Sequence, residues 1–223
     1  LMERDSIPVK ARPQKGIMKT PQDSEEFIFQ QKQLRDEDSD CASSHYNQGV
    51  SLMQEGRLDE AVEAFRKAIE NSARMFEAYV NLGYIFFKQG DLEMVVDANQ
   101  KAVGIEPRYA RGYANLGFAY LQMMKTDEAI AALNKALELN PDIVQAWSNL
   151  TNAYLQNAEV ERAIETGEKM VAMAPDFALG HNNLATAYFN NDEYEKAIEH
   201  VDKAIQLGFE PHPEFLKALA PYR

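Results

Sequence analysis

The sequence contains a single cysteine, Cys41, among 223 residues. One cysteine cannot form a disulfide within the chain, so cross-links do not hold this fold together. Such sparse use of cysteine fits a reducing compartment, and we expect a cytoplasmic protein. The chain begins at Leu1, so an upstream leader or anchor stays an open alternative.

Long apolar stretches are also missing. No uninterrupted run reaches the roughly 18 residues that a membrane-spanning helix needs, and residues 1–20 lack the apolar segment of a secretory signal. We therefore expect no direct membrane span. Hydrophobic residues nevertheless make up 45% of the chain, which indicates a globular protein with a sizeable core.

Positive charge is scarce, with 23 lysines and arginines against 35 aspartates and glutamates and a net charge of −12. A phosphate backbone would be repelled over most of such a surface, so we expect no nucleic-acid partner. The exception is residues 1–22, a basic arm whose prolines and glycine argue against a helix. A short helix and an acidic linker are predicted over 23–41.

The basic arm suggests a contact with the acidic remainder of the chain. Its apolar residues would anchor it in a groove of the same molecule or of a neighbouring copy, which makes a homo-oligomer possible; the alternative is an ordinary solvated tail. These anchors are Ile7, Val9, Ile17 and Met18. Deleting the arm should then raise the affinity for an outside peptide or break up oligomers.

Groupings typical of catalysis are missing as well. The sequence offers no nucleophile beside a base, no metal-ligand spacing and no phosphate-binding glycine loop. His45 and His181 fall at positions expected in the core, whereas His200 and His212 follow no metal-binding pattern. We therefore expect no enzyme, no cofactor and no metal.

What the sequence does contain is a repeat of 34 residues, starting near residue 42. Small, aromatic and proline residues recur at this interval. The small residues are Ala61, Val95, Ala129, Ala163 and Ala197, and again Ala68, Ala102, Ala136, Met170 and Ala204. The bulky ones are His45, Tyr79, Tyr113, Trp147 and His181, followed by Leu82, Leu116, Leu150 and Leu184 and, near the boundaries, by Pro107, Pro141 and Pro175.

This pattern resembles the tetratricopeptide repeat family. The resemblance implies an all-α, right-handed superhelical solenoid of antiparallel helix pairs, because one pair cannot bury its apolar face alone. Five repeats are expected at 42–75, 76–109, 110–143, 144–177 and 178–211, with a C-terminal cap at 212–223. Three residues depart from the family pattern: Asn99 and Gly167, where a large apolar residue is usual, and Gln48, where leucine is usual.

In tetratricopeptide superhelices the first helix of each pair lines a concave groove. One asparagine occupies the same groove position in every unit, as Asn47, Asn81, Asn115, Asn149 and Asn183. A carboxamide both donates and accepts, so this column of five, the asparagine ladder, would hold an extended peptide backbone. It is similar to the ladder of the peptide O-linked N-acetylglucosamine transferases, which holds bound peptides. The alternative is that the amides bond a neighbouring helix or water.

Beside the ladder runs an apolar stripe, which we expect to be partly exposed and to contact a partner. Its residues are Val50, Tyr84 and Phe118 and, one turn further along, Met53, Phe87, Leu121, Leu155 and Phe189. The competing interpretation is ordinary packing between adjacent helix pairs. The family's carboxylate clamp for chaperone tails is disfavoured, because Arg111 alone would meet a carboxylate and Asn115 stands where a second cation is needed.

We therefore predict an adaptor that binds an extended segment of another protein in its groove. A structural subunit or self-assembling scaffold, as in magnetosome-associated repeat proteins, is the alternative, with the N-terminal arm docking on a groove. A substrate-presenting part of an enzyme complex is a third possibility. The size distribution in solution separates the first two.

Overall fold

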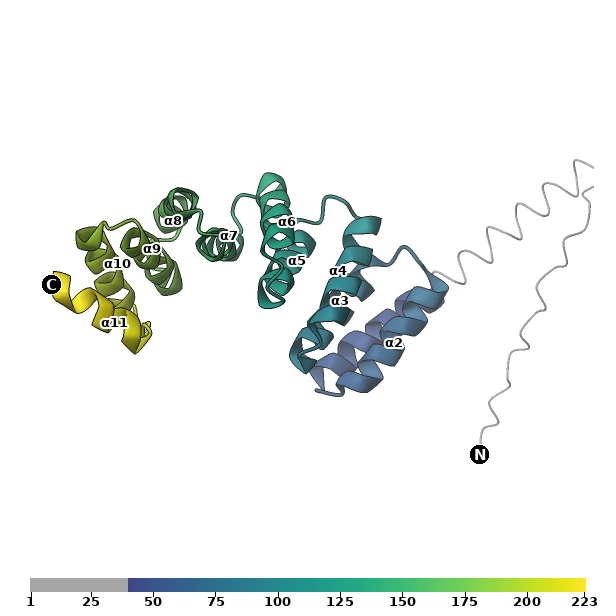
Figure 1. The fold of residues 1–223 in the computed structure, drawn as a ribbon. Coiled ribbons are helices and arrows are strands. Elements are labelled where there is room, and N and C mark those ends of the chain that lie inside the picture. Colours follow the sequence, from purple (N-terminus) through teal and green to yellow (C-terminus); the bar gives the residue numbers. More distant parts are fainter. Residues whose placement is uncertain (1–39) are drawn as a thin grey trace, which may run out of the picture.

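The computed structural model describes residues 40–223. The predicted basic arm, the short helix after it and nearly all of the acidic linker lie outside the described residues. Within the described range the chain is helical throughout, and Figure 1 shows the helices following one another along an arc.

The helices fall two by two along the chain, joined by short turns. A helix occupies residues 40–54 of the described range. After it come α2 (Leu58–Asn71), α3 (Phe76–Gln89), α4 (Leu92–Ile105), α5 (Ala110–Gln122), α6 (Thr126–Leu139), α7 (Val144–Gln156), α8 (Val160–Met173), α9 (Ala178–Asn190), α10 (Tyr194–Gln206), α11 (Pro213–Leu219) and the 3-10 turn Ala220–Tyr222.

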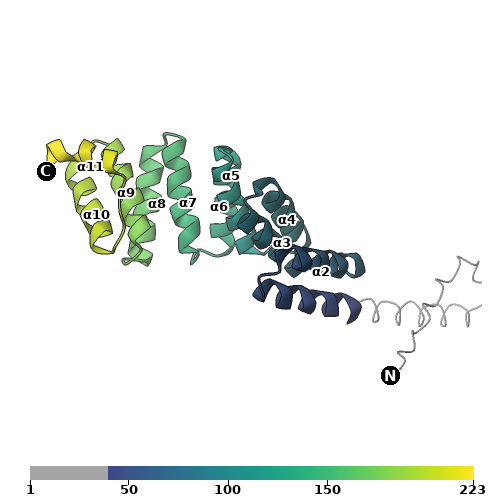
Figure 2. The same ribbon diagram turned by 90° about the horizontal axis from the view of Figure 1, so that it is seen from below.

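Each helix packs against its predecessor and its successor, and α5 also packs against α7, and α7 against α9. Figure 2 shows the resulting row of helices lying side by side. The expected all-α superhelical solenoid of antiparallel pairs is thus confirmed. None of the described helices is both long and apolar enough to cross a lipid bilayer.

The core is built from small residues where helices cross and from large ones between the crossings. Ala61, Ala129 and Ala163 are fully buried. Their small side chains let two helix backbones approach closely. Leu133 of α6 packs over Gly117 of α5, where an added Cβ would stand 2.4 Å from the Leu133 Cγ. A glycine is therefore required at this crossing.

Two aromatic side chains at the same position of successive units make the same contact. The Trp147 Nε1–H donates to the Pro141 carbonyl oxygen over 2.8 Å, and the His181 Nε2 lies 2.9 Å from the Pro175 carbonyl oxygen. His181 thus takes the place of the indole and is buried, as the sequence predicted. His45, in the first unit, is half-buried.

The last pair is closed by α11. Pro213 is its first residue, where the missing N–H costs nothing. Leu219 is fully buried, and the Phe215 ring meets the Phe189 ring of α9 edge to face, with centroids 5.6 Å apart. The expected C-terminal cap therefore covers the apolar end of the stack.

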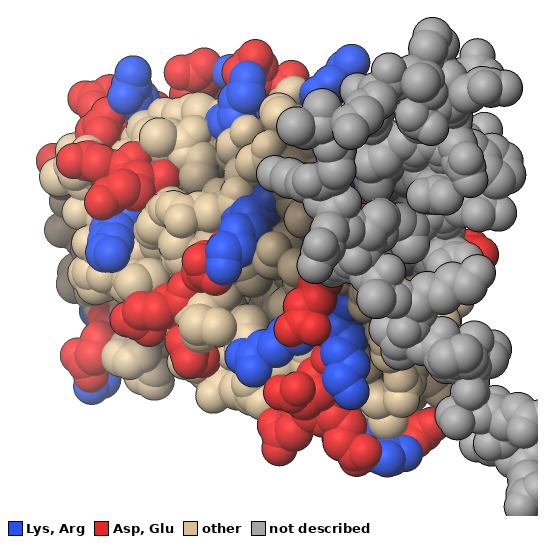
Figure 3. Space-filling view, turned by 90° about the vertical axis from the view of Figure 1, so that its right-hand side faces the viewer, with Lys and Arg blue, Asp and Glu red and all other residues tan. Residues whose placement is uncertain are grey.

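Charged side chains stay on the surface and pair mostly within one helix. Lys101 with Asp97 and Lys169 with Glu165, each 2.7 Å apart and one turn apart, are typical. Exposed pairs of this kind contribute at most about 1 kcal/mol. On the end of the molecule shown in Figure 3, blue and red side chains are interspersed and form no continuous basic patch over the described residues.

Candidate functional site

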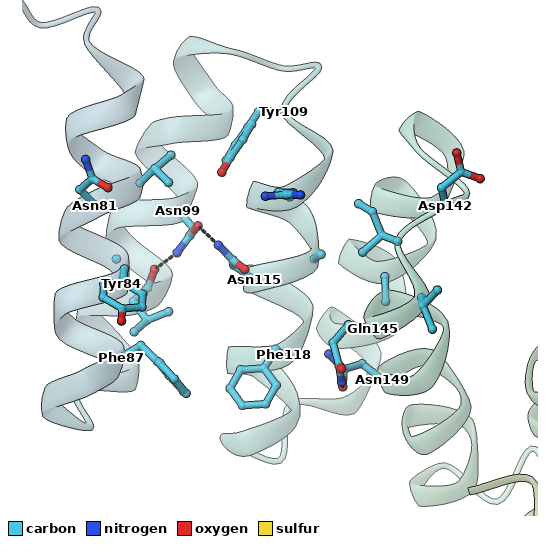
Figure 4. A pocket seen from close by; sticks show the side chains of 18 of the residues that line it. Asn81, Tyr84, Phe87, Asn99, Tyr109, Asn115, Phe118, Asp142, Gln145 and Asn149 are labelled. Atoms are coloured by element: carbon cyan, nitrogen blue, oxygen red, sulfur yellow. Dashed lines mark hydrogen bonds between the residues drawn. The ribbon is translucent and has the colours of Figure 1, made fainter. Parts of the chain in front are cut away.

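A cavity of about 980 Å³ opens along the first helices α3, α5 and α7. Its lining is mainly apolar and amide-bearing, with Arg111 and Asp142 as its two charged members. Other lining residues include Met53, Val80, Asn81, Tyr84, Phe87, Asn99, Tyr109, Ala114, Asn115, Phe118, Val144, Gln145 and Asn149. Figure 4 shows how side chains from α3, α5 and α7, together with Asn99 of α4, converge on this space. Such a surface suits an uncharged polypeptide backbone with apolar side chains.

The asparagine ladder divides into two parts. Asn81, Asn115 and Asn149 line the cavity, whereas Asn47 and Asn183 do not. The Asn81 Nδ2 donates to the Tyr46 hydroxyl over 3.2 Å, and the Asn183 Nδ2 donates to the Ser148 hydroxyl over 3.2 Å. In Asn81 and Asn183 the amide nitrogen therefore bonds to a neighbouring helix, which is the alternative that we stated for the ladder.

Asn115, in the middle of the cavity, is held by a residue from the core. Its Nδ2 donates over 3.1 Å to the Oδ1 of Asn99, whose own Nδ2 donates over 2.8 Å to the Val95 carbonyl oxygen. Asn99 is only 1% exposed, while Asn115 is exposed. Two hydrogen bonds thus lead from the backbone of α4 to the ladder, and Figure 4 draws both of them.

Asn149 is held by a residue of its own helix. The Gln145 Nε2 donates to the Asn149 Oδ1 over 3.2 Å. The two side chains lie one turn apart on α7 and both face the cavity. Every ladder amide inside the cavity is therefore oriented by a partner side chain before any ligand arrives, which lowers the entropy lost on binding.

Three aromatic residues of the stripe, Tyr84, Phe87 and Phe118, line the cavity. Tyr84 and Phe87 are 49% and 45% exposed, and the Phe87 and Phe118 rings meet edge to face with centroids 5.5 Å apart. We call these three residues the aromatic shelf. Lys88, at its edge, holds its Nζ 5.6 Å from the centre of the Tyr84 ring. Exposed aromatic area of this kind is typical of protein contacts.

Three other residues of the stripe pack in or against the core. Leu121 is 3% exposed and belongs to the core formed by α5 to α9, so the expectation that it contacts a ligand is wrong. Leu155 is half-buried against the same core, and Phe189 packs on the core that α11 closes. None of the three lines the cavity. Here the competing interpretation, packing between adjacent helix pairs, describes the contacts.

Arg111 lies in the first turn of α5, lines the cavity and is exposed. Within residues 40–223, no carboxylate oxygen lies within 4.0 Å of its guanidinium. Asp142 lines the same cavity just before α7 but does not pair with it. The neighbouring Tyr109 has its pKa raised by burial, an effect that the Arg111 charge partly offsets. Among the described residues, the Arg111 guanidinium is thus left without a carboxylate partner beside the cavity.

Sequence reasoning missed part of the lining. Asn99 was noted only as a departure from an apolar core position, although a buried amide needs partners and this need is itself a signal. Tyr109 and Gln145 lie at unit boundaries and on helix faces to which the repeat pattern assigned no role. Within the described residues, no three histidine, cysteine, aspartate or glutamate side chains come together as a metal site.

Comparisons with solved structures find the same architecture. A crystal structure of MamA is 25% identical and has a TM-score of 0.68, covering 71% of this chain and 93% of that one. YrrB, described as a TPR protein with an unusual peptide-binding site, is 21% identical with a TM-score of 0.68 over 80% and 90% of the two chains. PilF of Pseudomonas aeruginosa is 23% identical with a TM-score of 0.69 over 84% and 85%.

Comparison with family models identifies the repeats themselves. No protein with curated annotation matches the sequence. Models described as tetratricopeptide repeat match residues 76–109, 110–143, 132–165 and 178–208, and a model described as TPR repeat matches 49–90. The matches over 76–109, 110–143 and 178–208 each follow one helix pair, and the chain belongs to the tetratricopeptide repeat family.

Proposed function

We propose that this chain is an adaptor that binds an extended segment of another protein in the cavity along α3, α5 and α7. One observation carries the proposal: the ladder amides of Asn115 and Asn149 face the same concave cavity as the aromatic shelf, of which Tyr84 and Phe87 are exposed. Tetratricopeptide repeats are in general non-catalytic interaction modules. YrrB, of the same fold, is described as having a peptide-binding site.

The expected affinity comes from several modest contributions. Each amide–backbone hydrogen bond contributes about 0.5–1.5 kcal/mol net, and burying a large apolar side chain on the aromatic shelf contributes about 1.5–3 kcal/mol. Neither alone gives useful affinity, because association and ordering of the segment oppose binding. The ladder would therefore hold the backbone while the shelf selects the side chain.

The test compares proteins captured from an extract of the source cells by the parent and by the Asn115→Ala, Asn149→Ala double variant. We expect the double variant to lose the partner that the parent retains. The matched control is Asn71→Ala, Asn134→Ala, which removes two amides from the second helices α2 and α6 outside the cavity. Equal capture by all three proteins would contradict the proposal.

The solution mass separates an adaptor from a self-assembling scaffold. We expect a monomer whose mass by light scattering does not change with concentration. Large homo-oligomers would favour the scaffold instead. We further propose that the adaptor catalyses no reaction itself and works in the cytoplasm, which the single cysteine supports.

A further inference from the structure

The contact between Asn99 and Asn115 fixes which way the ladder amide faces. The Val95 carbonyl oxygen only accepts, so the Asn99 atom that faces it at 2.8 Å must be the NH2 group. The other atom, the Asn99 oxygen, then faces Asn115, which must turn its own NH2 group toward it. The Asn115 carbonyl oxygen is consequently left to accept from a ligand, and a backbone N–H is the donor that any peptide supplies.

A glycine gives the Asn99 amide room at this crossing. A Cβ at Gly83 would stand 2.7 Å from the Asn99 Nδ2. In the next unit the corresponding pair is Gly117 with Leu133, an ordinary apolar packing. Leucine can therefore pack beside the glycine at this crossing, as it does in the next unit. Asn99 stands where that leucine would be, and it holds the Asn115 amide so that the Asn115 oxygen stays free to accept. We therefore call Asn99 a positioning residue.

Three side chains on α5 present different chemistry to the cavity at helical spacing. Arg111, Asn115 and Phe118 lie on one face because they are four and three residues apart. At about 1.5 Å per residue, Arg111 and Phe118 are separated by about 10 Å along the axis, which an extended chain spans in about three residues. Within the described lining, Arg111 is the cation, with Lys88 at the edge beside Tyr84.

We propose that this part of the groove selects a segment that carries one acidic side chain about three residues from a large apolar one. The carboxylate pairs with Arg111, the backbone N–H between the two side chains donates to the Asn115 oxygen, and the apolar side chain lies on the aromatic shelf. Because the chain as a whole carries a charge of −12, a segment with many acidic residues is repelled, so the recognised charge is single. The inference rests on the proposed function.

The experiment measures binding of short synthetic peptides by fluorescence anisotropy. Each peptide carries one leucine or phenylalanine and, at varied spacing, one glutamate, glutamine or lysine in an otherwise alanine–serine chain. We expect the glutamate peptide of the best spacing to bind about fivefold more tightly than its glutamine counterpart, since exposed ion pairs contribute up to about 1 kcal/mol. The lysine peptide should bind most weakly.

The charge test uses Arg111→Glu, with Lys67→Glu as the matched control. Lys67 is an exposed cation on the second helix α2 and does not line the cavity. We expect Arg111→Glu to reverse the order, so that lysine peptides bind better than glutamate peptides. The control should keep the order of the parent, because both variants change the net charge equally.

The positioning role of Asn99 is tested with Asn99→Leu and a scan of N-methylated peptides. In the parent, methylating the one backbone nitrogen that donates to Asn115 should weaken binding about threefold to tenfold. Asn99→Leu should keep the fold, lose this dependence on N-methylation and still prefer glutamate to glutamine. A merely structural role for Asn99 would leave the N-methylation profile unchanged.

The outcomes separate this inference from the proposed function. Peptides that bind and depend on Asn115 and Asn149, but with equal affinity for glutamate, glutamine and lysine, would overturn the selection and leave groove binding intact. An order that Arg111→Glu does not reverse would overturn it as well. If no peptide binds the parent while the Asn115→Ala, Asn149→Ala variant still loses the captured partner, this inference fails and the proposed function stands.

Discussion

His181 of α9 and His200 of α10 face each other through their Nδ1 atoms, which are 2.9 Å apart. The Pro175 carbonyl oxygen only accepts, so the Nε2 of His181 donates to it, and in the neutral ring the Nδ1 is then the acceptor. His200 is therefore the donor of this bond. Its ring also stacks on Tyr188, with centroids 5.6 Å apart and planes inclined by 13°.

The first prediction is that acidification weakens the last helix pair. Burial and the neighbouring His181 lower the pKa of His200, and Lys196 adds to this, while Glu199 and Glu168 act in the opposite direction. With a lowered pKa in the folded state, the unfolded chain binds more protons once the pH falls below about 6.5. The free energy of unfolding should therefore fall as the pH drops from 6.5 through the folded-state value.

Urea unfolding at a series of pH values measures this effect, with His200→Gln beside the parent. The variant has no titrating ring at this position, so it should lose less stability than the parent over the same acid range. Equal losses in the two proteins would show that the histidine pair does not cause the pH dependence.

The second prediction contrasts two glycines in helices. Gly117→Ala places a Cβ against Leu133 and should lower the free energy of unfolding by about 1–3 kcal/mol through overpacking. Gly104→Ala, in α4, meets nothing within 4 Å and should raise it by about 0.5 kcal/mol, since alanine favours a helix. Thermal unfolding compares the two, and a loss of stability in both would contradict the assigned packing.

The third prediction contrasts an exposed residue of the apolar stripe, Phe87, with a buried one, Leu121. Phe87→Ser should change stability little, because the side chain is 45% exposed, yet it should weaken capture of the partner. Leu121→Ala removes a side chain that is 3% exposed and should cost about 2–5 kcal/mol. Chemical unfolding measures the change in stability, and the capture assay measures the change in partner binding. Unchanged capture by Phe87→Ser would argue against the shelf as a contact.

The fourth prediction concerns the C-terminal cap. Leu219→Ala should destabilise the protein by about 2–5 kcal/mol, because the fully buried side chain leaves a cavity. Hydrogen exchange should rise first in α10 and α11, since repeat units unfold from their ends. Lys217→Ala, an exposed change on the same helix, should stay within about 0.5 kcal/mol of the parent. Equal exchange in both variants would contradict a capping role.

Much of the fold was predictable because each helix pair is encoded within one 34-residue repeat. A 34-residue spacing of alanine, aromatic and proline residues defines the helix pairs, and helical spacing alone separates a core face from a groove face. The same reasoning also picked out residues that line the cavity, namely Asn81, Asn115, Asn149, Tyr84, Phe87 and Phe118. It also predicted a buried His181, although not its partner His200.

Which residues of the apolar stripe are exposed depended on how consecutive helix pairs pack on one another. Phe87 and Leu121 occupy the same position of neighbouring units, yet Phe87 is accessible and Leu121 lies in the core that α5 shares with α7. Spacing along one helix cannot distinguish them, because the approach of the next pair decides which residue is covered.

The sequence by itself therefore determined the family, the stacking of helix pairs and the recurrence of an asparagine at one position of every unit. Only the tertiary structure decided which ladder amides are directed toward the cavity. Asn99 and Asn115 are 16 residues apart and meet through the packing of α4 on α5. The physical reason is that hydrogen-bond direction depends on side chains from different helices, whereas periodicity describes only one helix at a time.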